Sequence, residues 1–255
     1  MGDLAGYPDE RPLSKVGIRK PFYMAKFATS NGQYALYEPK HDSGYVNYFN
    51  KDHVGPGLPL NGSHQPVVRV SWDKALAYCA WLSRKTGLKF TLPTEAQWEY
   101  ACRAGTATPM NYGAVNADFG KFANLADSRL LELCQRDSPK WIPAITNVND
   151  GATVTNDVGR YQANAWGLCD MHGNAAQWTL TTCKSYPYAE DGRDNGSPQG
   201  LKVVRGGSFY DRPIRARSAF RLAYPNWQRV FNVGFRVVCE PGDVKEAVIN
   251  VASTR

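Results

Sequence analysis

The sequence lacks any apolar run long enough to cross a membrane. Apolar stretches such as Val67–Val68 and Val237–Val238 are the size of strand segments, whereas a membrane-spanning helix needs about 20 apolar residues. The chain also lacks the composition of a disordered protein, because seven Trp, fourteen Tyr and ten Phe supply abundant apolar bulk. No apolar signal-peptide region follows Met1. We therefore expect a globular protein without a membrane span, in either an extracytoplasmic or a cytoplasmic compartment.

Cysteine and histidine are scarce and scattered. The chain has six cysteines and four histidines, and no cysteine pair has the Cys-x-x-Cys spacing. This pattern excludes a disulfide-dense scaffold and argues against a zinc ribbon or a thioredoxin-type site. Three histidines lie between residues 41 and 64, so a three-histidine metal site stays open, but nothing in their spacing favours one.

Basic residues exceed acidic residues by 30 to 23, for a formal net charge of +7. The excess is concentrated between Arg205 and Arg236, where seven arginines alternate with aromatic residues and Asp211 is the only acid. Such a stretch is compatible with binding to nucleic acid or another anion. We favour the simpler interpretation, in which the arginines pair with carboxylates and stack on aromatic rings inside the fold.

Two main helices are predicted in the first half of the chain. Ser71 is placed to cap a helix that runs to Lys85, and its apolar residues recur at helical spacing before Gly87. The segment Thr94–Gln97 has the pattern of a capping box, and Gly105 is expected to end the helix that it starts.

The remaining chain predicts short strands, turns and much coil. Residues 38–66, rich in Gly, Pro, Asn and His, are interpreted as a long surface excursion, and residues 126–133 as a short helix. The predicted strands are Val16–Ile18, Phe22–Met24, Val67–Val70 and Gly234–Val238. Without a repeat or linker, the sequence predicts one α+β domain over residues 1–255, with a core from about 10 to 240 and a polar tail at 241–255.

Four groups of motifs resemble a known family. They are residues 66–72 (PVVRVSW), 92–100 (LPTEAQWEY), 166–175 (WGLCDMHGNA), and 205–209 (RGGSF) with 234–236 (GFR). Together, in this order, they resemble the formylglycine-generating enzyme family, also called the sulfatase-modifying-factor family, over about residues 10–240. The resemblance implies a variant of the C-type lectin fold, with a twisted, mostly antiparallel sheet, two main helices and much ordered coil.

The same resemblance bears on copper chemistry. In the family's enzymes two cysteines hold a copper ion, which activates oxygen to convert a substrate cysteine to formylglycine. Counting from the Gly-Gly-Ser motif, the matching positions here are Asp211 and Ala216, and no cysteine lies between Cys183 and Cys239. Because Cu(I) requires soft thiolate ligands, neither copper nor the copper-dependent oxidase activity is expected.

The family's variable ligand-binding proteins display a surface after the Gly-Gly-Ser motif, so the resemblance implies a binding face in this segment. We predict a non-catalytic binding module whose arginines favour an anionic protein, peptide or glycan. The predicted face comprises Phe209, Tyr210, Asp211, Arg212, Trp227 and Arg229.

Two alternatives stay open. The first is an oxidoreductase-like enzyme that modifies a peptide or small molecule by a chemistry other than copper-dependent formylglycine formation. Its candidate polar groups are His172, Asp211, Tyr210 and Cys183. The second is nucleic-acid binding, which rests on charge alone and is the least favoured.

The resemblance also implies two structural calcium sites. The first set is the side chains of Asn124 and Asp150 with the carbonyls of Leu125 and Ala152. The second set is the side chain of Asp170 with the carbonyls of Met171, Gly173 and Ala175. Such oxygen ligands suit calcium, although Asp150 can equally be a turn residue and Asp170 the partner of an arginine.

A family disulfide between Cys79 and Cys239 is implied as well, shifted by two residues. The second family disulfide would use Cys102, but its partner falls in the cysteine-free stretch. A buried thiol at each position is the alternative.

Overall fold

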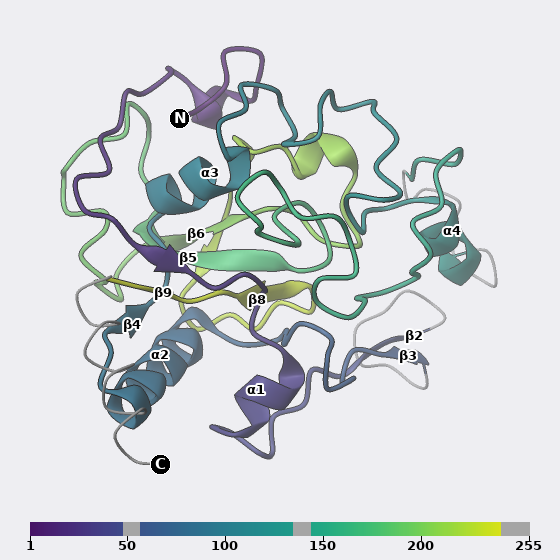
Figure 1. Cartoon of the computed structure of the whole chain (residues 1–255), viewed down its shortest axis with the longest axis horizontal. Helices are drawn as coiled ribbons and strands as arrows, with labels where there is room; N and C mark the ends of the chain where they lie inside the picture. Colours follow the sequence, from purple (N-terminus) through teal and green to yellow (C-terminus); the bar gives the residue numbers. More distant parts are fainter. Residues whose placement is uncertain (48–56, 135–143, 241–255) are drawn as a thin grey trace.

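The computed structural model describes residues 1–47, 57–134 and 144–240 (Figure 1). The predicted tail at 241–255 lies outside this range. In chain order the elements are η1 (Pro8–Glu10), β1 (Tyr23–Met24), α1 (Asn31–Ala35), β2 (Tyr45–Asn47), β3 (Gly57–Pro59), α2 (Trp72–Thr86), β4 (Phe90–Thr91), α3 (Glu95–Arg103), α4 (Ser128–Cys134), β5 (Ala176–Thr182), β6 (Leu201–Arg205), η2 (Pro213–Arg215), β7 (Leu222–Pro225), β8 (Val233–Phe235) and β9 (Val238–Cys239). The predicted α+β class is confirmed.

Three small sheets organise the strands. Their orders are β1-β9-β4, β2-β3 and β7-β6-β5-β8. Within these three sheets, the strands pair antiparallel except for the parallel pair of β5 with β8. In Figure 1, α3 lies above β5 and β6, whereas α2 lies below the sheets beside β4. Among the described residues, no helix is both long and apolar enough to span a bilayer.

The two main helices begin and end as their local sequence predicts. The hydroxyl of Ser71 accepts a hydrogen bond from the Lys74 amide, and Gly87 ends α2 with a positive φ of 77°. Thr94 and Gln97 form the predicted capping box at the start of α3. The last turn of α3 closes one residue earlier than predicted, because Ala104 itself adopts the left-handed conformation.

The strand predictions were less accurate. Residues 16–18 form no strand, and residues 67–70 are buried without joining a sheet; the amide of Val67 donates to the Thr29 carbonyl and that of Arg69 to the Val230 carbonyl. The predicted strand at 234–238 is divided between β8 and β9, which belong to different sheets. Burial was predicted correctly here, but strand pairing depends on partners distant in sequence.

The segment at 38–66 is only partly a surface excursion. It contains the β2–β3 hairpin, and Ser43, Val46 and Leu60 are buried, which corrects the prediction for this part of the segment. Residues 48–56 lie outside the described residues.

Three buried tryptophans anchor the core, and each satisfies its indole N–H. Trp72 donates to the Thr179 carbonyl and Trp178 to the Val70 carbonyl, each at 2.8 Å. Trp98 donates to Oε1 of Gln177 at 2.8 Å. A buried indole N–H usually has a hydrogen-bond partner, because leaving it unpaired is costly. These three bonds hold β5 against the start of α2 and the chain before it, and against α3.

The implied disulfide to Cys79 is not formed. Cys79 is a buried free thiol on α2, and burial raises its pKa to about 12. Cys102 is likewise a buried free thiol. The alternative of buried thiols therefore holds for these two positions.

We predict that Gly234→Ala destabilises the fold by about 1–3 kcal/mol, because overpacking forces neighbouring groups apart. A Cβ at this position in β8 would lie 2.2 Å from the Val67 carbonyl oxygen, which is backbone. Gly17→Ala is the matched control, since its added Cβ meets nothing within 4 Å. Urea unfolding of both variants measures the difference; equal stability would contradict the close packing of 234 on 67.

Candidate ligand-binding face and cation sites

The predicted face begins at a tight turn after β6. Gly206 and Gly207 both have positive φ, and a Cβ at Gly207 would lie 2.9 Å from that of Ala216. The buried hydroxyl of Ser208 then donates to Oδ2 of Asp211 at 2.6 Å and accepts from Nδ2 of Asn232 at 2.7 Å. Because the glycines have no Cβ, the turn can pack closely on Ala216. Ser208 hydrogen-bonds to residues near both ends of the segment 209–231, and so holds these ends close together.

The structure separates the six predicted face residues into a buried and an exposed group. Phe209 and Asp211 are buried, and burial raises the pKa of Asp211. Tyr210 is half-buried against Phe231, with ring centroids 5.4 Å apart. Arg212, Trp227 and Arg229 are exposed, Trp227 to 70%. We call Tyr210, Arg212, Trp227 and Arg229 the exposed face.

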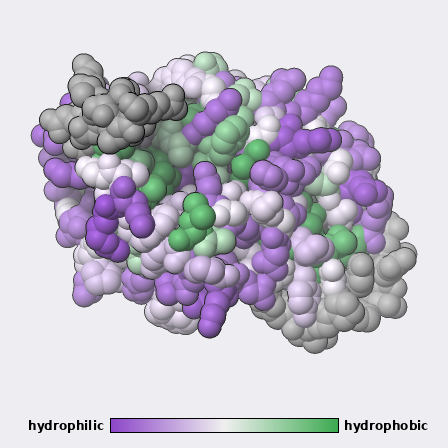
Figure 2. All heavy atoms as spheres, turned by 60° about the horizontal axis from the view of Figure 1, so that its bottom comes forward, coloured by the Kyte–Doolittle hydropathy of each residue, from purple (hydrophilic) through white to green (hydrophobic). Residues whose placement is uncertain are grey.

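The positive charge of the exposed face is partly offset at one end. Arg229 lies close enough to Glu38 and His41 to lower the pKa of both, as a smaller contribution than the Lys74 hydrogen bond at Glu38 and burial at His41. Glu38 also pairs with Lys74 at 2.9 Å. Figure 2 shows one side of the molecule, on which hydrophilic residues predominate. The exposed guanidinium groups of Arg212 and Arg229 favour a polar ligand for the exposed face over an apolar one.

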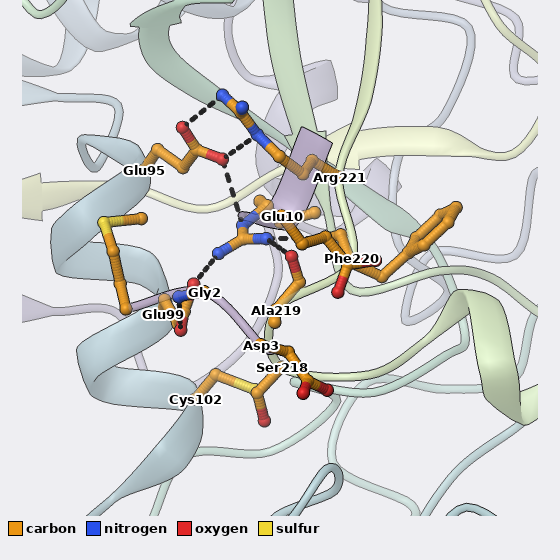
Figure 3. Close-up of polar contacts among 12 residues, drawn as sticks. Gly2, Asp3, Glu10, Glu95, Glu99, Cys102, Ser218, Ala219, Phe220 and Arg221 are labelled. Atoms are coloured by element: carbon orange, nitrogen blue, oxygen red, sulfur yellow. Dashed lines mark hydrogen bonds and ion pairs between the residues drawn. The ribbon is translucent and has the colours of Figure 1, made fainter. Parts of the chain in front are cut away.

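Most of the remaining arginines of the basic stretch lie in the interior. Arg221 makes two hydrogen bonds to Glu95, at 2.7 and 2.8 Å (Figure 3). Arg205 contacts Glu99 and donates to the carbonyls of Ala219 and Phe220. The interpretation that these arginines pair with carboxylates inside the fold is confirmed for both.

Arg217 and Arg236 are buried too, but they have different partners. Arg217 pairs with Glu10 at 2.6 Å and with Asp3 at 2.9 Å. Arg236 donates to Oε1 of Gln177 and to main-chain carbonyls, and burial lowers its pKa to about 10. Since these four side chains are committed to internal contacts, the arginines of the stretch that remain exposed to an anionic ligand are Arg212, Arg215 and Arg229.

The residues of the first predicted calcium site lie on two loops, at 124–125 and 150–152. Amides of Leu125 and Ala152 donate to the two carboxylate oxygens of Asp150, each at 2.9 Å. Asn124 donates through Nδ2 to the Val154 carbonyl, whereas its Oδ1 is buried without a hydrogen-bond partner among the described residues. Burial, with the nearby charge of Asp127 adding to it, raises the pKa of Asp150 to about 7. A bound cation would give Oδ1 of Asn124 a partner and would neutralise the negative charge of the Asp150 carboxylate.

The second predicted set lies beside the first. The amide of Asn174 donates to the Asn124 carbonyl at 2.8 Å, and Gly173 bridges to Asn124. Asp170 is buried; its Oδ2 accepts from the Gly159 amide at 2.7 Å, while its Oδ1 has no hydrogen-bond partner among the described residues. Arg236 donates a hydrogen bond to the Asp170 carbonyl at 3.4 Å. Its positive charge also lowers the pKa of the Asp170 carboxyl group, against the larger raising effect of burial, so the alternative of an arginine partner at Asp170 is supported in part.

Asp127 contacts the first predicted calcium-ligand set, although it was not predicted from the sequence as a site residue. Its Oδ1 accepts from the amides of Arg129 and Leu130, which caps α4, and its Oδ2 accepts from the Asp150 amide at 2.6 Å. An Asp before an apolar run is a helix-start signal and could have identified it. Within residues 1–47, 57–134 and 144–240, no group of three or more His, Cys, Asp or Glu side chains is placed to hold one metal ion.

Two of the polar groups suspected of other chemistry, His172 and Cys183, lie in surroundings that disfavour their charged forms. His172 is buried; its Nδ1 lies 2.7 Å from the Ala216 carbonyl, and its Nε2 accepts from the Asn111 amide at 3.0 Å. Burial lowers the pKa of His172 to about 4, so the ring is neutral at pH 7. Cys183 is half-buried, and burial raises the pKa of its thiol, which disfavours a nucleophilic thiolate.

We predict that Arg221→Met lowers the free energy of unfolding by about 3–5 kcal/mol, because it leaves the buried Glu95 without its bidentate partner. Arg129→Met is the matched control, since its ion pair with Glu132 is exposed on both sides and should contribute less than about 1 kcal/mol. Urea unfolding distinguishes them; a small loss for Arg221→Met would show that the buried network is dispensable.

The comparisons with known proteins agree on one family. The family described as "Sulfatase-modifying factor enzyme 1-like domain" matches residues 1–241. The formylglycine-generating enzyme of Mycobacterium tuberculosis is 31% identical over 69% of this chain and 58% of its own length. The mouse protein named inactive Cα-formylglycine-generating enzyme 2 is 31% identical over 78% of this chain and 57% of its own. The chain thus spans little more than half the length of these relatives. The solved structure of PvdO from Pseudomonas aeruginosa matches with a TM-score of 0.71 and 26% identity, over 94% of this chain and 90% of that one.

Proposed function

Because this chain belongs to the sulfatase-modifying factor enzyme 1-like family, we propose that it is a non-catalytic member that binds an anionic peptide or glycan. The observation that carries the proposal is the lack of thiolates after the Gly-Gly-Ser turn. Asp211 and Ala216 occupy the positions expected for copper ligands, and both are buried. No cysteine lies between Cys183 and Cys239 to replace them.

Two features support a binding role. A relative with 31% identity is itself named inactive, so the family includes members named for lost activity. The segment 209–231 also exposes Trp227, an aromatic ring that is 70% exposed, and the guanidinium groups of Arg212 and Arg229. Tryptophan and arginine are the residue types that contribute most to binding interfaces, and guanidinium groups bind carboxylates and sulfates through paired donors.

Charge reversal tests the exposed face. We predict that Arg212→Glu with Arg229→Glu weakens binding to a polyglutamate peptide and to a heparin oligosaccharide at least about tenfold, because attraction becomes repulsion. Arg160→Glu, an exposed arginine outside the segment, controls for charge, and melting curves control for folding. Titration calorimetry at physiological salt separates the two probes. Affinity unchanged by the double substitution would remove this face from the proposal.

We propose in addition that calcium stabilises the loops at 124–125, 150–152 and 170–175. Asn124, Leu125, Asp150 and Ala152 would hold one ion, and Asp170, Met171, Gly173 and Ala175 the other. The unpaired oxygens of Asn124 and Asp170 support this, because a buried acceptor without a donor is costly. The bound ions would neutralise buried carboxylates and cross-link coil.

Chelation tests the calcium sites. We predict that EDTA lowers the melting temperature of the purified protein and that calcium restores it. Asp150→Asn and Asp170→Asn should each reduce this response, because each removes one carboxylate ligand. Asp157→Asn, an exposed aspartate, is the control. Elemental analysis should find about two calcium ions per chain; a chelator-insensitive protein without calcium would contradict the sites.

The calcium response should depend on pH. Without an ion, the pKa of Asp150 in the folded chain is about 7, against an ordinary value of 3.8. The folded state therefore binds more protons than the unfolded state between these values, and the stability of the ion-free protein falls as pH rises from about 4 to about 7. Calcium favours the ionised form, so its stabilising effect should grow over this window. Asp150→Asn should flatten the dependence; the same calcium effect at pH 5 and pH 8 in the unsubstituted protein would contradict it.

A further inference from the structure

A cavity lies away from the exposed face and the two proposed calcium sites. It has a volume of about 550 Å³ and lies between residues 15–20, the first turn of α3 and the loop 188–194. This volume is in the range of small-molecule sites. The residues of the exposed face and the calcium-ligand sets do not line it.

Two of the charged side chains that line this cavity are left without an ion-pair partner among the described residues. Its lining includes three basic and three acidic side chains. Two pairs satisfy each other at the rim, Arg19 with Glu190 at 2.8 Å and Lys20 with Glu240 at 3.5 Å. The remaining two charges are Lys15, which is positive, and Asp194, which is negative. The cavity therefore offers one cation and one anion to a ligand.

Asp194 is held in place as a carboxylate acceptor. The hydroxyl of Tyr188 lies 2.8 and 2.6 Å from the two carboxylate oxygens of Asp194 and shares its single proton between them, and the hydroxyl of Thr181 donates to Oδ1. Thr181 cannot turn away, because its oxygen accepts from the Glu95 amide at 2.8 Å. Burial raises the pKa of Tyr188, so Tyr188 remains a donor. A carboxylate has about four acceptor positions, which leaves room for an incoming ammonium group.

Tyr188 connects the segment of Lys15 to Asp194. Its amide donates to the hydroxyl of Ser14 at 2.8 Å, which places the main chain of Tyr188 next to Lys15. Its hydroxyl, at the other end of the side chain, contacts Asp194. Arg193 lies over the ring at 4.7 Å and limits its movement. Tyr188 therefore contacts both Asp194 and the residue that precedes Lys15, and Lys15 and Asp194 line the same cavity.

From this arrangement we propose that the cavity binds a small zwitterion of the amino-acid or dipeptide class. The ligand's ammonium group would contact Asp194, and its carboxylate would contact Lys15. The assignment is independent of the proposed exposed face, since it rests on other residues.

Single-charge analogues test this assignment. The probes are L-alanyl-L-alanine, its N-acetyl derivative, which lacks the ammonium group, and its amide, which lacks the carboxylate, each titrated by ligand-observed NMR. The unsubstituted protein should bind the zwitterion about tenfold or more tighter than either analogue, through one additional charge-assisted contact.

Two variants then assign each end of the ligand. Lys15→Met should weaken binding of the zwitterion and of the N-acetyl derivative about tenfold and leave binding of the amide unchanged. Asp194→Asn should weaken binding of the zwitterion and of the amide about tenfold and leave binding of the N-acetyl derivative unchanged. Lys89→Met, an exposed lysine elsewhere, should change nothing. If Asp194→Asn does not fold, the analogue series on the unsubstituted protein still decides the question. Equal binding of all three probes, no saturable binding of the zwitterion, or binding unaffected by Lys15→Met overturns the proposal.

Discussion

Two buried carboxylates on one face of α3 connect most of the architecture. Glu95 and Glu99 are four residues apart and therefore share a face of the helix. Glu95 pairs with Arg221 before β7, and Glu99 contacts Arg205 at the end of β6. Because a buried charge is tolerated only with its partner, the position of α3 determines where β6 and the chain before β7 lie. The Gly-Gly-Ser turn, and hence the exposed face, follows directly from β6.

The parts of this fold that the sequence predicted are those determined locally. Ser71, Gly87 and the Thr94–Gln97 capping box act within a few residues, so α2 and α3 were found nearly to their ends. A second capping box, Ser30 with Gln33, starts the short α1 and was overlooked although its signal was present. β5, β6 and β7 could not be found this way, because each depends on a strand more than fifteen residues away.

At the candidate site, too, the sequence predicted some features and not others. The pairing of arginines with carboxylates followed from charge and aromatic content, and Arg205 and Arg221 confirm it. The burial of Phe209 and Asp211 could not be predicted, since it arises from contacts with Phe231 and Ser208 that only the folded turn creates. The cavity between Lys15 and Asp194 joins segments almost 180 residues apart, and neither segment carries a motif.

Mass spectrometry of a cysteine-containing peptide measures whether this protein carries out copper-dependent oxidation. The purified protein, supplied with copper, a thiol reductant and oxygen, would be incubated with a cysteine-containing sulfatase peptide. The Streptomyces coelicolor formylglycine-generating enzyme, 31% identical to this chain, serves as the positive control under the same conditions. We expect the cysteine to be converted by the control and to remain unchanged with this protein. Conversion to formylglycine by this protein would contradict the proposed non-catalytic role and place a metal site elsewhere in the chain.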